Sequence, residues 1–363
     1  MGEKIRLNQI CAKGTSSLRQ KDLLPEGKYP VYGAAGIAGY LNSYQFEQEY
    51  LAVVKDGAGV GRVQLCDRKS SVLGTLQPII PNDSVKLSYL RFMLEGLHLE
   101  SYASGATIPH IYFRDYGERL VDLPDADEQE CVTCLFETIL KQIALGEQML
   151  AKADELIQSR FVEMFGDDSF AFVPLDQIAD VQGGLTKNSK RQKLPLQLPY
   201  LRVANVLAGS LDLTEIKTIG LTESERDKTM LETGDLLFVE GNGSGDQIGR
   251  SAIWKGEIDC CVHQNHLIRA RFHDGILPSF ALYYFNSRSG RRQIIGKAVS
   301  TSGLYTLSTG KIKSLKLPLP PVALQNEFAE FVTSVESLKS TARQQLDRLN
   351  TLYASLTQRY FAQ

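Results

Sequence analysis

The sequence predicts an α+β protein with two β-rich modules, each followed by a long helix, and the two helices pair as an antiparallel coiled coil. Two observations lead to this prediction. Residues 123–167 and 319–363 are two copies of one segment, aligned without a gap. Residues 1–122 and 168–318 consist of short β-type runs separated by glycine and asparagine turns. The chain is therefore expected to contain two modules and two long helices, in the order module, helix, module, helix.

The repeated segment has fixed landmarks. Each copy begins with Leu-Pro and carries a glutamine six positions after that leucine, at Gln129 and Gln325. Three residues near the end of the first copy, Leu156, Ser159 and Phe165, recur in the second as Leu352, Ser355 and Phe361. We therefore expect four parts: module 1 (1–122), helix segment 1 (123–167), module 2 (168–318) and helix segment 2 (319–363).

Apolar residues in both copies step alternately by four and three, which is typical of a coiled-coil seam. In the first copy the predicted pairing residues are Phe136, Ile139, Ile143, Leu150 and Ile157. In the second copy they are Phe331, Val335, Leu338, Leu349, Leu352 and Leu356. Gly146 and Ala342 place a small residue at the same level of both helices, where close approach is expected. The alternative is that each helix packs on its own module or on another protein.

The modules resemble each other weakly. Residues 5–10 (IRLNQI) are similar to residues 173–178 (VPLDQI), and the glycine-rich residues 56–62 are similar to residues 240–250. Both glycine-rich segments lie between predicted strands. We interpret them as hairpin turns, because the chain after Arg250 continues as a strand and does not open the helix that a cofactor loop needs.

Composition restricts the class of protein. The chain is 43% hydrophobic and 23% charged with a net charge of −2, so any nucleic-acid surface must be local. The start of the sequence lacks a signal peptide, and no apolar run is long enough to cross a membrane, which favours a cytoplasmic location. The six cysteines do not form a disulfide framework. Cys131 and Cys134 have zinc-ligand spacing, but no second pair completes a site.

Motifs for catalysis are missing from the sequence. It contains no Gly-Lys-Ser/Thr phosphate loop, no G-x-S-x-G, no HExxH and no Asp/Asn-Pro-Pro-Tyr/Phe amino-methylation motif. His263 and His266 form a polar cluster with Gln264 and Asn265, but we identify no third metal ligand. We interpret this cluster as loop polarity or as an edge that reads bases. No catalytic or metal-binding residue is predicted.

Two basic patches lie in the second module. Their members are Lys187, Lys190, Arg191, Lys193 and Arg202 in one, and Arg288, Arg291, Arg292 and Lys297 in the other. Both are mixed with Asn, Gln, Ser or Tyr, the residue types that contact phosphates and base edges. A solvated surface is the alternative interpretation.

Several sequence motifs, taken in their order along the chain, resemble those of the specificity (S) subunit of type I restriction–modification systems. The resemblance covers essentially the whole chain. The segment Leu317-Pro-Leu-Pro-Pro-Val-Ala-Leu-Gln325 and the heptads after it resemble the conserved spacer helix of that family. Residues 199–206, 234–238 and 263–268 resemble one type of its target recognition domains. Residues 29–36, 72–75 and 104–111 resemble another type.

The resemblance implies a non-catalytic subunit that binds double-stranded DNA. Each recognition domain would read one half of a bipartite site, and the paired helices would set the unread spacer. Two methyltransferase (M) subunits and restriction/translocase (R) subunits would be the partners. S-adenosylmethionine, ATP and Mg would be bound by those partners, and this chain would hold no cofactor.

Candidate DNA-contacting residues follow from residue type and motif position. In the first module they are Tyr32, Lys55, Arg62, Thr107, His110 and Tyr112. In the second module they are Lys187, Lys190, Arg191, Arg202, Asn205, Asn242, Ser244, Arg250, Gln264 and Asn265. Two other functions stay open. One is a self-contained modification enzyme with a degenerate cofactor loop at residues 238–243, and the other is a protein-binding scaffold or anti-phage adaptor.

Overall fold

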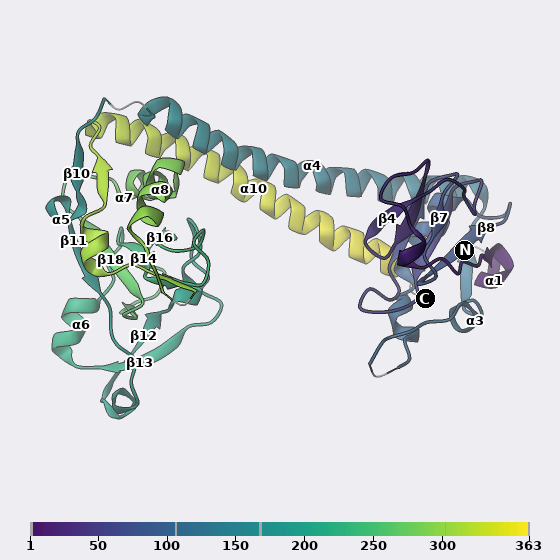
Figure 1. Cartoon of the computed structure of the whole chain (residues 1–363), viewed down its shortest axis with the longest axis horizontal. Helices are drawn as coiled ribbons and strands as arrows, with labels where there is room; N and C mark the ends of the chain where they lie inside the picture. The colour runs from purple at the N-terminus through teal and green to yellow at the C-terminus, as the bar shows by residue number, and fades with distance from the viewer. Residues whose placement is uncertain (1–2, 106, 167–168, 302, 362–363) are drawn as a thin grey trace. The chain divides into compact units, whose positions relative to one another are not determined.

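The structure, a computed structural model, describes residues 3–105, 107–166, 169–301 and 303–361. It divides into two compact units, Met1–Met149 with Ala342–Gln363, and Leu150–Thr341. Each unit contains one module together with half of α4 (Ala126–Phe165) and half of α10 (Val322–Phe361). Within each unit the two half-helices lie side by side (Figure 1). The expected pairing of the two long helices is therefore confirmed. The predicted segment ends at residues 167 and 363 lie outside the described residues.

The module of the first unit is built from short strands and short helices. Its elements are β1 (Glu3–Arg6), α1 (Leu7–Ile10), β2 (Cys11–Lys13), η1 (Gln20–Asp22), β3 (Tyr29–Gly33), β4 (Gly36–Leu41), β5 (Tyr50–Val54), β6 (Val63–Cys66), β7 (Ser71–Val72), β8 (Leu76–Pro81), α2 (Leu87–Gly96), η2 (Leu99–Tyr102), α3 (Phe113–Tyr116) and β9 (Leu120–Leu123). They form sheets in the orders β2-β8-β5-β6, β4-β3-β7 and β1-β9.

The module of the second unit has more elements. They are β10 (Phe172–Pro174), α5 (Leu175–Ile178), β11 (Ala179–Gly183), η3 (Ser189–Lys193), β12 (Leu196–Leu201), η4 (Val203–Asn205), β13 (Lys217–Leu221), α6 (Glu223–Thr229), β14 (Leu236–Val239), β15 (Gly241–Asn242), β16 (Ser251–Ile253), β17 (Val262–His263), β18 (Leu267–Phe272), α7 (Pro278–Asn286), α8 (Arg288–Lys297), β19 (Val299–Thr301), β20 (Leu304–Thr306), α9 (Thr309–Lys313) and β21 (Lys316–Pro318). Their sheets are β11-β18-β14-β16, β13-β12-β17, β15-β20-β19 and β10-β21.

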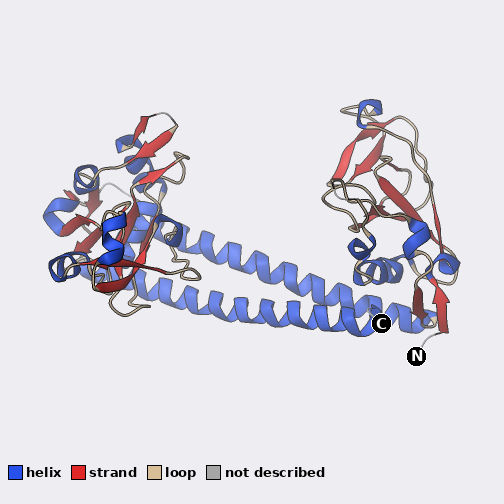
Figure 2. Ribbon diagram, turned by 90° about the horizontal axis from the view of Figure 1, so that it is seen from below, coloured by secondary structure: helices blue, strands red, loops and turns tan. Residues whose placement is uncertain are grey.

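The two modules share one topology. The four-stranded sheets β2-β8-β5-β6 and β11-β18-β14-β16 correspond strand for strand, and both are antiparallel throughout. The second sheets, β4-β3-β7 and β13-β12-β17, each contain one parallel pair. Figure 2 shows strands gathered beside helices in both modules. The short helices α1 and α5 carry the similar sequences LNQI and LDQI, so the weak sequence similarity reflects a repeated fold.

Aromatic side chains join each module to the long helices. In the first unit the ring of Phe136 on α4 lies 5.1 Å from that of Phe92 on α2 and 5.5 Å from that of Phe361 on α10. In the second unit Phe161 lies 5.8 Å from Phe280 on α7 and 5.3 Å from Phe328 on α10. Burying each such side chain contributes roughly 1.5–3 kcal/mol, which makes the helix ends part of the module cores.

Two glutamines at matching positions tie the helices to the modules. Gln129 is 2% exposed; its Oε1 accepts from the Lys86 N–H at 2.8 Å, and its Nε2 donates to the Ser84 and Pro124 carbonyls at 3.0 Å. Gln325 repeats this arrangement and is 1% exposed. Its Oε1 accepts from the Leu277 N–H at 2.9 Å, and its Nε2 donates to the Gly275 and Pro320 carbonyls at 3.2 and 2.9 Å. Lys86 and Leu277 are the N-caps of α2 and α7, so each glutamine satisfies backbone groups at a helix start.

The pairing seam agrees with the prediction on α4 and differs from it on α10. Along α4, Phe136, Ile139 and Ile157 are buried and Ile143 and Leu150 are half-buried, as the stepping predicts. Along α10, Val335 is buried and Phe331, Leu349 and Leu356 are half-buried, but Leu338 is 69% exposed and Leu352 is 45% exposed. The assignment of Leu338 and Leu352 to the seam was wrong. The residues that face the core there are Val332, Val335, Lys339, Ala342 and Leu346.

Two contacts show how this seam is filled. Gly146 leaves room for Leu346, because a Cβ at Gly146 would lie 2.7 Å from Cδ2 of that leucine. Lys339 replaces an apolar residue at a core position of the second unit, where its Nζ binds Asp154 Oδ1 at 2.6 Å and Glu336 Oε1 at 2.5 Å. Its cation is thereby paired on both sides although the side chain is only 7% exposed.

No helix in the described ranges is both long enough and apolar enough to cross a membrane.

Candidate nucleic-acid interface

Each module presents a glycine-rich turn beside a second hairpin. The turn at residues 56–62 connects the antiparallel strands β5 and β6, and the turn at residues 240–250 connects β14 and β16. In each module a backbone hydrogen bond joins the second hairpin to a residue at the start of the glycine-rich turn. The Ile111 N–H donates to the Lys55 carbonyl at 3.0 Å, and the Leu307 N–H donates to the Glu240 carbonyl at 2.7 Å. Both glycine-rich segments are therefore hairpin turns, as predicted.

Positive backbone angles explain several of these glycines. Gly57 has φ +90° in open space, and Gly61 has φ +87° where a Cβ would lie 2.6 Å from the Glu100 backbone nitrogen. Only glycine takes this conformation without strain. The tip of the turn therefore lets another molecule approach the backbone closely.

In the first module, an aromatic and basic group lies next to the turn. His110 Nδ1 pairs with Asp56, and the His110 ring packs edge-on to Tyr112 with centroids 4.1 Å apart. Tyr112 is 43% exposed, and the Arg114 guanidinium lies 4.5 Å from the centre of its ring. Arg62 and Thr107 are exposed and Lys55 is half-buried. These candidates share one region, and Arg114 belongs with them although its sequence context gave no signal for it.

Tyr32 does not belong to this exposed group. It is 8% exposed, and its hydroxyl donates to Asp67 Oδ2 at 2.7 Å. Burial and the hydrogen bond to Asp67 raise the pKa of Tyr32 to about 12. The structure gives Tyr32 a role inside the module in place of the predicted surface contact, because its polar atom is already used.

The first basic patch separates into exposed lysines and a bound arginine. Lys187 and Lys190 are exposed. Arg191 makes a two-pronged ion pair with Glu225 at 2.8 and 3.0 Å and also donates to the Thr186 and Gly220 carbonyls. This arginine and a backbone hydrogen bond at Thr222 lower the pKa of Glu225 to about 2. The lysines remain available to phosphates, whereas Arg191 holds η3 to α6.

Three further candidates hold the segment around η4. Asn205 is 2% exposed and donates to the Asp212 and Glu215 carbonyls at 2.8 and 3.1 Å. Arg202 pairs with Glu215 Oε2 at 2.9 Å, and Arg250 donates to the Val206 and Val203 carbonyls at 2.6 and 3.0 Å. In the free chain these side chains stabilise the loop. The expected base contact of Asn205 is not available, because its side chain is buried.

The remaining candidates lie on two adjacent loops. Asn242 is half-buried and its Oδ1 accepts from the Ser244 N–H at 2.9 Å, which leaves the Ser244 hydroxyl exposed. Gln264 and Asn265 are half-buried between β17 and β18, where their backbone N–H groups donate to the Leu201 and Leu185 carbonyls. Within the described chain, the side-chain amides of these two residues form no hydrogen bond. They remain free to pair with a ligand.

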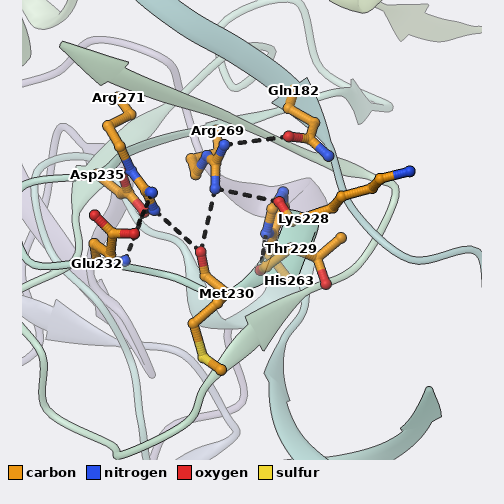
Figure 3. Close-up of polar contacts among 9 residues, drawn as sticks. All are labelled: Gln182, Lys228, Thr229, Met230, Glu232, Asp235, His263, Arg269 and Arg271. Atoms are coloured by element: carbon orange, nitrogen blue, oxygen red, sulfur yellow. Dashed lines mark hydrogen bonds and ion pairs between the residues drawn. The ribbon is translucent and has the colours of Figure 1, made fainter. Parts of the chain in front are cut away.

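Behind these loops lies a buried polar cluster (Figure 3). The Arg269 guanidinium donates to the Met230 carbonyl at 3.2 Å and to Gln182 Oε1 at 3.2 Å. Arg271 forms an ion pair with Asp235 at 2.8 Å and a second with Glu232. These contacts anchor the segment after α6 to the four-stranded sheet. They support the loops, and the guanidinium groups of Arg269 and Arg271 are engaged within the cluster.

His263 belongs to this cluster and not to the exposed loop. It is fully buried, and its Nδ1 donates to the Thr229 carbonyl at 3.1 Å. Burial and the nearby Arg269 cation lower the pKa of His263 to about 4. The histidine is thus neutral at pH 7. Across the described ranges, no group of three or more His, Cys, Asp or Glu side chains could hold a metal ion.

The second basic patch adjoins the glycine-rich turn. Arg291 on α8 donates to the Asp246 carbonyl at 3.0 Å, which fixes α8 to residues 240–250. Arg288 and Arg292 on the same helix are exposed, and Lys297 is half-buried. This arrangement can supply positive charge next to the turn.

Comparisons with known proteins identify similar chains and a matching family. A family model described as the type I restriction modification DNA specificity domain matches residues 2–154 and 168–351. The chain is 26% identical over 284 residues to the EcoKI specificity subunit of Escherichia coli K12, covering 73% of this chain and 61% of that protein. It is 26% identical over 286 residues to the StySPI specificity subunit of Salmonella potsdam, covering 73% and 60%. The matches therefore span about three-fifths of those relatives.

Two solved structures share the fold. A type I restriction–modification S subunit from M. genitalium matches with a TM-score of 0.57 and 17% identity, covering 99% of this chain and 96% of that one. A chain from a study of complex assembly and conformational transition in a type I R-M system matches with a TM-score of 0.63 and 15% identity, covering 99% and 97%. At this identity the likeness concerns the fold.

Proposed function

The chain belongs to the type I restriction–modification DNA specificity family, and we propose that it is the sequence-specific DNA-recognition subunit of a type I restriction–modification complex. The observation that carries this proposal is the repetition of one surface in both modules. Each has a glycine-rich turn, a second hairpin at its base, and exposed polar or basic side chains around them. Two copies of a reading surface in one chain fit a bipartite site.

The exposed side chains fit two kinds of DNA contact. Arg62, Lys187 and Lys190 are exposed cations, which suit phosphates and set affinity and position. Gln264 and Asn265 carry free amides, which can pair with base edges and so select sequence. Arg191, Arg202 and Arg250 support the reading loops from within. Under this assignment, Gln264 and Asn265 determine the preference for DNA sequence. Arg191, Arg202 and Arg250 stabilise the loops.

The long helices would position the two half-sites and bind the partner subunits. Forty helical residues extend about 60 Å, and a helix of fixed length makes the unread spacer a geometric requirement, as half-site spacing does in dimeric DNA-binding proteins. Both helices also expose large apolar side chains away from the pairing seam: Met149, Leu156, Val162, Leu338 and Leu352 are 51%, 52%, 63%, 69% and 45% exposed. Such surfaces fit protein partners.

We assign these helix surfaces to two methyltransferase subunits, with restriction/translocase subunits joining the complex. S-adenosylmethionine, ATP and Mg would then be bound by those partners and not by this chain. A cytoplasmic location is part of the same proposal, because the substrate is cellular DNA.

Mapping of methylated adenines by long-read sequencing tests the proposal. The genome would be compared with the gene intact, deleted, and restored on a plasmid. Loss of methylation at one split motif on deletion, with recovery on restoration, is the expected result. An unchanged map in cells that express the methyltransferase partner would contradict the proposal.

Two rival functions predict different results in binding assays. A protein-binding scaffold would not bind duplex DNA, whereas a recognition subunit in complex with its partner binds DNA with a steep salt dependence. A self-contained modification enzyme would bind S-adenosylmethionine as a purified single chain. Calorimetry with that cofactor on the single chain and on the assembled complex separates these possibilities.

A further inference from the structure

The hairpin beside each glycine-rich turn carries an exposed aliphatic residue at the same position. In the first module the hairpin is closed by two backbone hydrogen bonds of 2.9 Å between Ser104 and His110. In the second it is the β19–β20 pair. Ile108 and Leu304 lie in these hairpins and are 65% and 48% exposed. Among the described residues, each is the most exposed large hydrophobic side chain of its module.

The anchoring of the two hairpins makes these positions equivalent. Ile111 and Leu307 are each 1% exposed and are held by their N–H groups to the carbonyls of Lys55 and Glu240. Ile108 and Leu304 both stand three residues before that anchor. One exposed aliphatic residue needs no explanation in a soluble protein. Its recurrence at the same point of two modules with different sequences indicates a shared use.

The surroundings of the two side chains identify the occupant as DNA. Tyr112 and Arg114 follow the first hairpin directly, and the side chain of Arg114 is 75% exposed. The second hairpin follows α8, which exposes Arg288 and Arg292. Each module thus presents an exposed aliphatic residue together with exposed cations, which suits a polyanion with an apolar interior. In a duplex, aliphatic side chains contact thymine methyl groups or enter between base pairs.

We propose that Ile108 and Leu304 are specificity-determining residues that make apolar contact with bases, one in each half of the site. This inference rests on the proposed function. It adds a second recognition mode to the hydrogen bonds of the neighbouring polar residues. Because an aliphatic side chain contacts no phosphate, it contributes to sequence preference and not to the electrostatic part of binding.

The test uses the assembled methyltransferase complex and the split motif that the genome map defines. Ile108→Ser should relax preference at one or two positions of one half-site, and Leu304→Ser should do so in the other half. Affinity for the cognate duplex should fall roughly 5- to 100-fold, while the slope of log affinity against log salt stays unchanged. Ile108→Leu should retain the preference.

Leu120→Ser is the matched control, because Leu120 is 57% exposed on β9 in the same module. Its affinity and base preference should equal those of the wild type. If Ile108→Ser and Leu304→Ser change neither preference nor affinity beyond this control, the inference is wrong. It is equally wrong if they reduce assembly with the methyltransferase and leave DNA preference intact.

Two modified duplexes distinguish the kind of base contact. If the aliphatic side chain contacts a thymine methyl group, replacing that thymine by uracil weakens DNA binding by the wild type. Binding by the serine variant then stays unchanged. A rise in 2-aminopurine fluorescence on binding, absent with the serine variant, marks insertion between bases. Either result supports apolar contact, and the absence of both contradicts it. Failure to find any split motif would instead reject the proposed function itself.

Discussion

Acidification should weaken the second unit through one buried histidine. His263 is fully buried on β17, its Nδ1 is bound to the Thr229 carbonyl, and its Nε2 has no partner in the described part of the chain. Protonation would place a second cation next to Arg269 (Figure 3). The folded state therefore resists protonation, and the pKa of His263 falls to about 4.

The sign and size of the effect follow from linkage. In the unfolded chain the histidine binds its proton at its ordinary pKa of 6.5, and in the folded chain only near 4. Stability is thus complete above pH 6.5 and is lost as the pH falls through the folded pKa. At about 1.4 kcal/mol per pH unit, the loss amounts to roughly 3 kcal/mol. That is a large fraction of the 5–15 kcal/mol typical of a folded domain.

Urea denaturation followed by tryptophan fluorescence measures this loss. The chain has a single tryptophan, Trp254, which is 1% exposed in the second unit and reports on that unit. The free energy of unfolding would be measured from pH 7 to pH 4.5 for the wild type and for His263→Gln. The difference between the two should change by about 2 kcal/mol over this range, because the variant lacks the titrating group and pH 4.5 still lies above the folded pKa of about 4.

His266→Gln is the control, because that side chain is 54% exposed and pairs with Glu240 at 2.9 Å. The loss of stability that His263 causes on acidification should persist in this variant. A difference between wild type and His263→Gln that stays constant from pH 7 to pH 4.5 would refute the reasoning.

Four other predictions concern the helices and the DNA surface. Gln325→Leu should cost roughly 2–4 kcal/mol by leaving backbone groups unpaired, and hydrogen exchange should accelerate at Leu277 but not in the first unit. Gly146→Leu should destabilise the first unit by roughly 1–3 kcal/mol, because the larger side chain overpacks the seam. Thermal unfolding measures this loss, and the exposed-site variant Leu145→Ala is the control. Lys190→Ala should weaken binding to all sequences and lower the salt slope by about one, measured by fluorescence anisotropy at several salt concentrations. Seven residues inserted into the middle of both helices add about 10 Å. The methylation map should then show the spacer longer by about three base pairs, and an unchanged spacer would reject the helices as its determinant.

The sequence predicted where both long helices lie in the chain, but it did not predict which face of α10 packs in the seam. Apolar stepping located both helices and the seam of α4. On α10 the same stepping is satisfied by two alternative sets, one with Leu338 and one with Lys339. Hydrophobicity favoured the leucine, whereas the structure buries the lysine with Asp154 and Glu336. Aligning the two copies of the repeat shows which residues of α10 correspond to the seam of α4. In that alignment Lys339 corresponds to Ile143, so Lys339 would have been assigned to the seam.

The sequence located the region of the candidate DNA surface but did not show which of its side chains are exposed. Sequence located the glycine-rich turns, because glycine spacing is local information. It did not separate Lys190 from Arg191, which are neighbours of the same charge. Only tertiary structure shows that Arg191 is committed to Glu225. Asn205 was misjudged for the same reason, since burial depends on contacts distant in sequence.

The two glutamine joints have a consequence for how such proteins diversify. Among the residues that the structure describes, the side chains of Gln129 and Gln325 bind backbone atoms alone, namely the amides of Lys86 and Leu277 and carbonyls nearby. Every residue type except proline offers the same amide, so a module can change its side chains without losing its attachment. Surface loops of a module can therefore change in sequence while its attachment to the long helices stays constant. The glutamine joint is thus independent of the side chains that the modules present.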